Sequence, residues 1–151
     1  MGEESEKGRM VDGQTVEISL PNEQGYERIA METTASFAKI VGFAPERVED
    51  LKTAVSEACR NAIEHGNGGR LDARVYVTMN FKDGSFRVSV RDEGKGIREF
   101  PEPPDITEKI KTQEAPGGIG TFLIKELMDQ VEFNHLPGEG HEVKMILKLA
   151  H

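Results

Sequence analysis

Two stretches of alternating apolar residues, joined by a short turn, constrain the fold of this 151-residue chain more than any other feature. The first covers residues 73–81 and the second residues 86–90, and in each the apolar side chains occupy every second position. Lys82-Asp83-Gly84 lies between them and supplies a turn. A strand with one apolar face needs another layer to cover that face. The pattern therefore predicts an antiparallel hairpin with one buried side.

The flanking segments supply the remaining strands and the covering layer. Apolar residues at spacings of three and four predict helices, and short alternating runs predict strands. Their order along the chain predicts an α+β fold, a two-layer sandwich in which helices cover one face of a mixed, mostly antiparallel sheet. The expected elements are strands at 16–20, 131–133 and 143–147 and helices at about 23–41, 45–65 and 121–128.

The apolar pattern fails in two places. Residues 1–13 read as a flexible polar tail, which leaves residues 14–150 as a single domain. Four prolines punctuate the stretch at about residues 95–116, where no helical or strand period is visible. A segment of this length inside a compact domain is typical of a lid or a binding loop, or else it is disordered. Of these possibilities, we expect a lid.

Charge and composition exclude several classes of protein. The chain carries 19 Lys and Arg against 27 Asp and Glu, a net charge of −8, which argues against direct binding to nucleic acid. No apolar run approaches the roughly 20 residues that cross a bilayer. The single cysteine, Cys59, suits a reducing compartment. These features predict a soluble, cytoplasmic protein without a nucleic-acid or membrane partner.

A first chemical cluster lies on the second predicted helix. Glu57, Asn61 and His65 follow one another at intervals of four, so their side chains stack on one flank of that helix. A carboxylate and an amide oxygen one turn apart could serve as a base and as a ligand of Mg²⁺, which prefers oxygen. Taken alone, the same residues also fit the solvent-facing side of an ordinary amphipathic helix.

A second cluster follows the central hairpin. The two-residue period places Asp92 on the same face as the apolar residues of 86–90, and Gly94 and Gly96 come directly after it. A carboxylate there is costly unless a donor reaches it, and the amine of an adenine is one such donor. The glycines would let a flat base approach the backbone. A plain turn leaving a strand is the alternative.

A third cluster opens the last predicted helix. Glycines at the start of a helix leave its first N–H groups free to face an anion, and the helix dipole favours a phosphate there. The pattern is neither a Walker nor a Rossmann sequence. A flexible hinge is the alternative. The cluster comprises Gly117, Gly118, Ile119, Gly120 and Thr121.

Together and in this order, the clusters resemble the Bergerat-fold ATPases, the GHKL superfamily of gyrase, MutL and histidine kinases. Glu57 and Asn61 look like its N box, residues 92–96 like its adenine-binding box and residues 117–120 like its glycine box. The amino-acid sequence of residues 54–66 is very similar to the corresponding segment of the small anti-sigma-factor serine/threonine kinases. The resemblance covers about residues 14–149, nearly the whole chain.

The resemblance implies ATP and Mg²⁺ as cofactors and a role for each cluster. Glu57 would be the catalytic base and Asn61 the metal ligand, while Asp92 would select adenine. Related kinases often carry an arginine near the end of the lid, but residues 99–116 contain only Lys109 and Lys111 as cations. The implied cofactor-binding residues are Asn61, Asp92, Gly94, Gly96, Ile97, Lys111, Gly117, Gly118, Ile119, Gly120 and Thr121.

The resemblance also implies partners. Such kinases phosphorylate an anti-sigma-factor antagonist of the STAS type and hold a sigma factor inactive. The kinases of this family are commonly homodimers. Two alternatives stay open. The missing lid arginine favours a nucleotide-binding anti-sigma or adaptor module with little kinase activity. A stand-alone ATPase domain of the histidine-kinase type would need a partner chain, because this chain has no room for a helical dimerisation domain.

Overall fold

The computed structural model describes residues 15–95 and 118–150. The predicted tail lies outside the described residues, as does the lid beyond Lys95. The same is true of four predicted cofactor-binding residues, Gly96, Ile97, Lys111 and Gly117.

The described chain forms one five-stranded sheet with helices on one side. Its strands lie in the order β1-β2-β3-β5-β4, and all four pairings are antiparallel, so the α+β prediction is confirmed. In chain order the elements are β1 Val16–Pro21, α2 Glu27–Val41, α3 Pro45–Asn61, the π-helical turn η1 Ala62–Gly66, β2 Arg74–Lys82, β3 Ser85–Arg91, α5 Gly118–Leu127, β4 Gln130–Leu136 and β5 Gly140–Lys148.

The central hairpin forms as its alternating pattern predicts. Lys82 pairs with Ser85 across a turn in which Asp83 and Gly84 both have positive φ, 53° and 75°. Such a turn matches the right-handed twist of the strands that it joins. The apolar residues of β2 and β3 point to the same side, where Val77, Met79 and Phe86 are fully buried. This buried face is the floor of the hydrophobic core.

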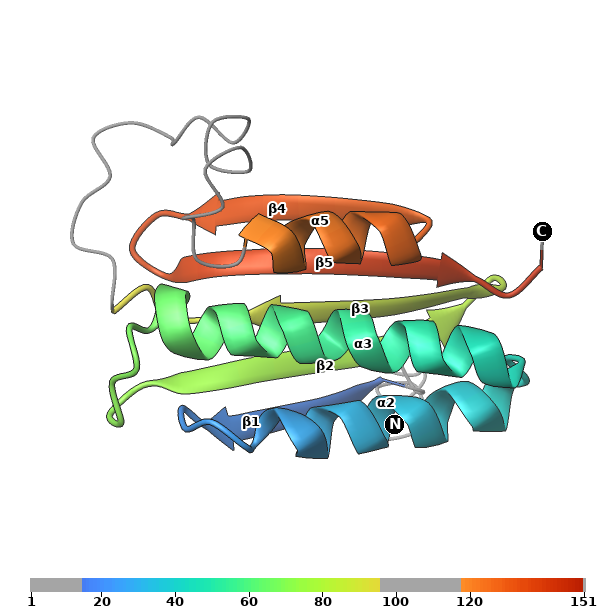
Figure 1. Ribbon diagram of the computed structural model, residues 1–151, viewed down its shortest axis with the longest axis horizontal. Coiled ribbons are helices and arrows are strands. Elements are labelled where there is room, and N and C mark those ends of the chain that lie inside the picture. The colour runs from blue at the N-terminus through green and yellow to red at the C-terminus, as the bar shows by residue number, and fades with distance from the viewer. Residues whose placement is uncertain (1–14, 96–117, 151) are drawn as a thin grey trace, which may run out of the picture.

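Three helices cover that face. In Figure 1, α2, α3 and α5 all lie on the same side of the sheet, and α5 lies over the β4–β5 end. Phe37 from α2 packs edge-to-face on Phe86, with ring centroids 5.0 Å apart, and Phe43 contacts the same ring at 6.0 Å. None of the helices in the described part of the chain is both long and apolar enough to span a membrane.

The observed ends of two helices differ from the predicted ones. Helix α2 begins at Glu27 rather than 23, because residues 23–26 form a turn in which the N–H of Tyr26 donates to the carbonyl of Glu23. Helix α5 begins at Gly118, so the described glycines of the third cluster lie inside its first turn. The glycines are therefore part of the helix N-terminus rather than a linker before it.

Helix α3 does not stop at its α-helical end. It continues into the π-helical turn η1, and the N–H of Asn67 donates to the carbonyl of Ala62 at 2.8 Å. A π turn inserts one extra residue per turn and is frequent at functional sites. Here it brings Gly66 against the end of β3.

Candidate nucleotide-binding site

Asp92 is a buried carboxylate at the exit of β3. Only 5% of the residue is exposed. Its Oδ1 accepts hydrogen bonds from the N–H of Gly94 at 2.7 Å and from the N–H of His141 at 3.0 Å, and the Nδ1 of His141 lies 3.2 Å away. These donors offset the cost of burying one oxygen. Among the described residues, no hydrogen bond reaches the second oxygen, Oδ2.

Glycines surround this carboxylate because no side chain fits there. A Cβ on Gly66 would overlap Oδ2 of Asp92, and a Cβ on Gly140 would overlap the Asp92 carbonyl. Gly94 has φ +71°, and a Cβ there would lie 2.9 Å from the Cα of Gly140. The structure thus places Gly94 against β5. Its contact with a bound base stays a prediction.

A fully buried pair of asparagines holds the backbone next to Asp92. The Nδ2 of Asn67 donates to the Oδ1 of Asn22 and to the carbonyl of Arg74, both at 3.0 Å. The Oδ1 of Asn67 accepts from the N–H of Glu93 at 2.8 Å. Asn22 in turn donates to the carbonyl of Arg70 at 2.9 Å. The network joins the end of η1 to the exit of β3. No local pattern predicts it, because its two asparagines are 45 residues apart.

Glu93 extends this network toward the surface. It accepts from the hydroxyl of Tyr76 at 2.9 Å, and the carboxylate beside that phenol raises the pKa of Tyr76 above its ordinary value. Lys95 pairs with the other oxygen of Glu93 at 3.5 Å. The side chain of Glu93 therefore points away from the cavity and anchors the strand exit.

Glu57 and Asn61 lie on the flank of α3 that faces the start of α5. A Cβ on Gly120 would lie 2.6 Å from the Oε1 of Glu57 and 3.7 Å from the Nδ2 of Asn61. A glycine at this position thus lets the first turn of α5 lie directly against the two polar side chains. The first and third clusters of the sequence meet here, as their predicted roles require.

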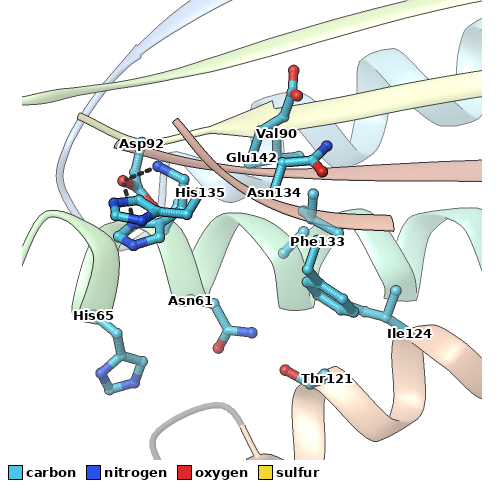
Figure 2. Close-up of a pocket in the computed structure, with 14 residues that line it drawn as sticks. Asn61, His65, Val90, Asp92, Thr121, Ile124, Phe133, Asn134, His135 and Glu142 are labelled. Atoms are coloured by element: carbon cyan, nitrogen blue, oxygen red, sulfur yellow. Dashed lines mark hydrogen bonds and ion pairs between the residues drawn. The ribbon is translucent and has the colours of Figure 1, made fainter. Parts of the chain in front are cut away.

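A cavity of about 360 Å³ joins the three clusters. Asn61, Asp92 and Thr121 all line it, and Figure 2 shows the Asn61 amide and the Thr121 hydroxyl facing each other across it. Glu57 is not part of its wall, although it lies beside Asn61 and Gly120. Ile119 is 65% exposed and does not line the cavity either.

The β4–β5 hairpin supplies a wall that the sequence did not predict. Phe133, Asn134, His135 and His141 all line the cavity. They were missed because no motif marks them and because their place at the site depends on the register of a long-range hairpin. His135 and His141 pair with each other across the hairpin, which no pattern within either strand predicts.

The first turn of α5 ends at this cavity, which Thr121 lines. The first four N–H groups of a helix have no acceptor within the helix, and the dipole adds positive potential at that end. In α5 these groups belong to Gly118, Ile119, Gly120 and Thr121. A phosphate chain bound near Thr121 would meet them.

The amide oxygen of Asn61 is a suitable ligand for a magnesium ion that arrives with a nucleotide. No group of three or more His, Cys, Asp or Glu side chains within residues 15–95 and 118–150 could hold a metal ion by itself. Mg²⁺ keeps several waters and commonly binds through one or two protein oxygens plus phosphates. One amide oxygen at the cavity wall matches that mode of binding.

Cys59 takes no part in this chemistry. It is fully buried in α3, and burial raises the pKa of its thiol from 9.0 to about 12, with a smaller contribution from Glu27. The thiolate is the reactive form of cysteine, so this residue is an inert part of the core.

Comparison with known proteins places the whole described fold in one family. The model of the histidine kinase-like ATPase domain matches residues 20–147. A serine-protein kinase RsbW of Bacillus pumilus is 35% identical over 124 residues, which cover 78% of this chain and 76% of that protein. An anti-sigma F factor of Oceanobacillus iheyensis is 30% identical over 132 residues, with 87% of this chain and 88% of that protein covered.

Solved structures show the same fold at lower sequence identity. The RsbU and RsbW domains of a Mycobacterium tuberculosis protein superpose with a TM-score of 0.66 at 19% identity, and the match covers 91% of this chain and 33% of that one. A chain of the SiaB–SiaC complex from Pseudomonas aeruginosa gives 0.67 at 11% identity, with 97% of both chains covered. This chain belongs to the histidine kinase-like ATPase domain family, together with the RsbW serine-protein kinases and the anti-sigma F factors.

Proposed function

We propose that this protein is an ATP-dependent serine/threonine protein kinase and anti-sigma factor that works in a partner-switching module. Its substrate would be a STAS-type anti-sigma-factor antagonist. The names of the relatives support this activity, since they include both serine-protein kinases and anti-sigma factors. The observation that carries the proposal is the environment of Asp92, which lines the cavity. Three protein nitrogens lie within hydrogen-bond distance of its Oδ1, while no described donor reaches its Oδ2.

In this proposal the cavity binds ATP with its base at Asp92. The 6-amine of adenine would donate to Oδ2, the oxygen that no described hydrogen-bond donor reaches. The phosphates would extend toward Thr121 and the N-terminus of α5, where the backbone N–H groups of 118–121 neutralise charge. Gly94 would line the base site, and Gly96, Ile97, Lys111 and Gly117, which lie outside the described residues, would also bind the nucleotide.

Asn61 would hold Mg²⁺ against the phosphates, and the ion would supply charge neutralisation during transfer. Glu57 would accept the proton of the incoming serine or threonine hydroxyl. The hydroxyl oxygen then forms a bond to the γ-phosphorus, the bond between that phosphorus and the β–γ bridging oxygen breaks, and ADP leaves. Arg60 pairs with Glu57 at 3.6 Å, and the side chain of Glu57 is 24% exposed.

Binding of a sigma factor and formation of a homodimer complete the proposal. Both follow from the family rather than from any contact within this chain. A partner-switching role also fits a cytoplasmic location, to which the buried thiol of Cys59 is suited.

The test is a transfer assay with purified protein, labelled ATP, Mg²⁺ and the cognate STAS protein. Acid-stable phosphoserine or phosphothreonine on the STAS protein is expected. Glu57→Gln should slow transfer by roughly 10²- to 10⁴-fold, because the variant lacks the general base that accepts the hydroxyl proton. It should change ATP affinity little, because the adenine-binding part of the cavity is intact. Glu49→Gln, an exposed glutamate near the other end of α3, is the matched control. Equal labelling with Glu57→Gln and with the control would disprove the assignment of Glu57.

The absence of arginine from residues 99–116 favours one second candidate, a nucleotide-binding anti-sigma module with little transfer activity. Lysine offers a point charge where arginine offers a planar fork, so γ-phosphate contact from such a lid is weaker. ATP binding with no labelled protein would select this candidate. Acid-labile phosphate on a partner histidine would instead select the histidine-kinase type.

A further inference from the structure

His141 is joined to Asp92 by more hydrogen bonds than any other described residue. Its N–H donates to the Oδ1 of Asp92 at 3.0 Å, and its ring Nδ1 lies 3.2 Å from the same oxygen. The N–H of Asp92 donates back to the carbonyl of His141 at 2.9 Å. Figure 2 draws the contacts of the carboxylate as dashed lines. Backbone and side chain of one residue therefore both fix this carboxylate.

The His141 ring is itself held by a second histidine. His135 lies directly opposite in the β4–β5 pairing, and the two rings stack with centroids 4.8 Å apart and planes 16° apart. Both residues line the cavity, in which Figure 2 labels His135. We name these two residues the histidine pair.

The pair has a physical consequence for Asp92. The terminal torsion of an aspartate is broad, so an unrestrained carboxylate presents either oxygen to a ligand. With the donors of His141 and Gly94 concentrated on Oδ1, the plane of the carboxylate is fixed and only Oδ2 is left for a ligand. An ionised oxygen accepts hydrogen bonds and cannot donate them. The site therefore favours a base that presents an N–H donor at this point and rejects one that presents a carbonyl.

We infer that His141 is a positioning residue for Asp92, and that the histidine pair forms a wall of the base site that sets its preference for a 6-amino purine over a 6-oxo purine. This inference rests on the proposed binding of ATP at Asp92. Adenine carries the amine, whereas hypoxanthine carries an oxygen at the same position and is otherwise of the same shape. Inosine triphosphate is therefore the matched probe.

The experiment measures the affinity of the full chain for ATP and for inosine triphosphate by titration calorimetry in magnesium buffer. His141→Ala should lower ATP affinity by about 10-fold, the value of one hydrogen bond to a charged group. The affinity for inosine triphosphate should change less, so the ratio of the two affinities falls. His141→Gln keeps an N–H donor on a side chain of similar reach and should restore part of the ratio.

His135 separates stacking from hydrogen bonding. His135→Phe keeps a flat ring against His141 and should retain the wild-type ratio, while His135→Ala removes the stack and should lower it. Lys144→Ala, on an exposed position of β5, is the control and should change neither affinity. Thermal unfolding of each variant confirms that the fold is retained.

Two failures are distinguishable. Wild-type protein that binds no ATP would overturn the proposed function, and with it this inference. Wild-type protein that binds ATP, with an unchanged ratio in folded His141→Ala, would overturn the inference alone.

Discussion

Replacing Asn67 with alanine removes the centre of the buried asparagine network, and we expect the change to weaken both folding and ATP binding. Three hydrogen bonds are lost, two donated by Nδ2 to Asn22 and to the Arg74 carbonyl and one accepted from the N–H of Glu93. Since Glu93 follows Asp92 directly, the same change loosens the backbone next to the carboxylate that we propose to bind adenine.

The magnitude follows from the number and burial of these bonds. A typical hydrogen bond contributes about 0.5–1.5 kcal/mol net, and a buried partner left unsatisfied costs about 1–3 kcal/mol. Asn22 is only 1% exposed, so its Oδ1 has no water to replace the lost donor. We expect Asn67→Ala to lower the free energy of unfolding by roughly 3 kcal/mol, which for a domain of this size lowers Tm by roughly 6–12 °C.

A double-mutant cycle with Asn22→Ala tests the reasoning by urea unfolding. Because the two side chains share one hydrogen bond, their effects should be non-additive by about 1 kcal/mol. Asn80→Ala is the matched control, since its Oδ1 has no described hydrogen-bond partner. The reasoning is refuted if Asn67→Ala costs no more than Asn80→Ala, or if the effects of Asn22→Ala and Asn67→Ala simply add.

Three further predictions concern the site and the core. Gly66→Ala should reduce ATP affinity at least about 10-fold in calorimetry, because its Cβ would displace the Asp92 carboxylate; unchanged affinity would contradict this contact. Cys59 should react with a thiol reagent only after unfolding. In the folded protein the pKa of the Cys59 thiol is about 12, above the ordinary 9.0. The contribution of this thiol to the free energy of unfolding is therefore complete below pH 9.0 and is lost as the pH rises toward 12. That loss should be absent from Cys59→Ala in unfolding titrations at increasing pH. Phe86→Ala should cost roughly 3–5 kcal/mol in urea unfolding, and a cost under about 1 kcal/mol would contradict its place in the core.

Local periodicity was enough to predict most of the fold. The alternation in 73–90 produced the central hairpin, because each strand has one face in the core and one in solvent. The four-residue spacing of Glu57 and Asn61 likewise placed both on one flank of α3. Such features depend on neighbours in the sequence, so the sequence alone reveals them.

The parts that were missed depend on contacts between distant segments. The π turn at η1, which brings Gly66 close to Asp92, cannot be predicted from the local apolar spacing of the helix. The histidine pair exists because the register of β4 and β5 brings the two rings face to face, and this register cannot be deduced from the sequence of either strand alone. Residues 23–26 carry helical spacing, but the turn that contains Gly25, with φ +107°, delays the start of α2.

The central claim is that Oδ2 of Asp92 receives the amine of adenine, and calorimetry of ATP binding to Asp92→Asn tests it most directly. In this variant the N–H donors of Gly94 and His141 would hold the amide oxygen in the place of Oδ1, so the NH₂ group would face the adenine amine, donor against donor. We predict that wild-type protein binds ATP in magnesium buffer and that the variant, still folded, binds it about 10- to 100-fold more weakly. Equal affinity of the two proteins for ATP would contradict the claim.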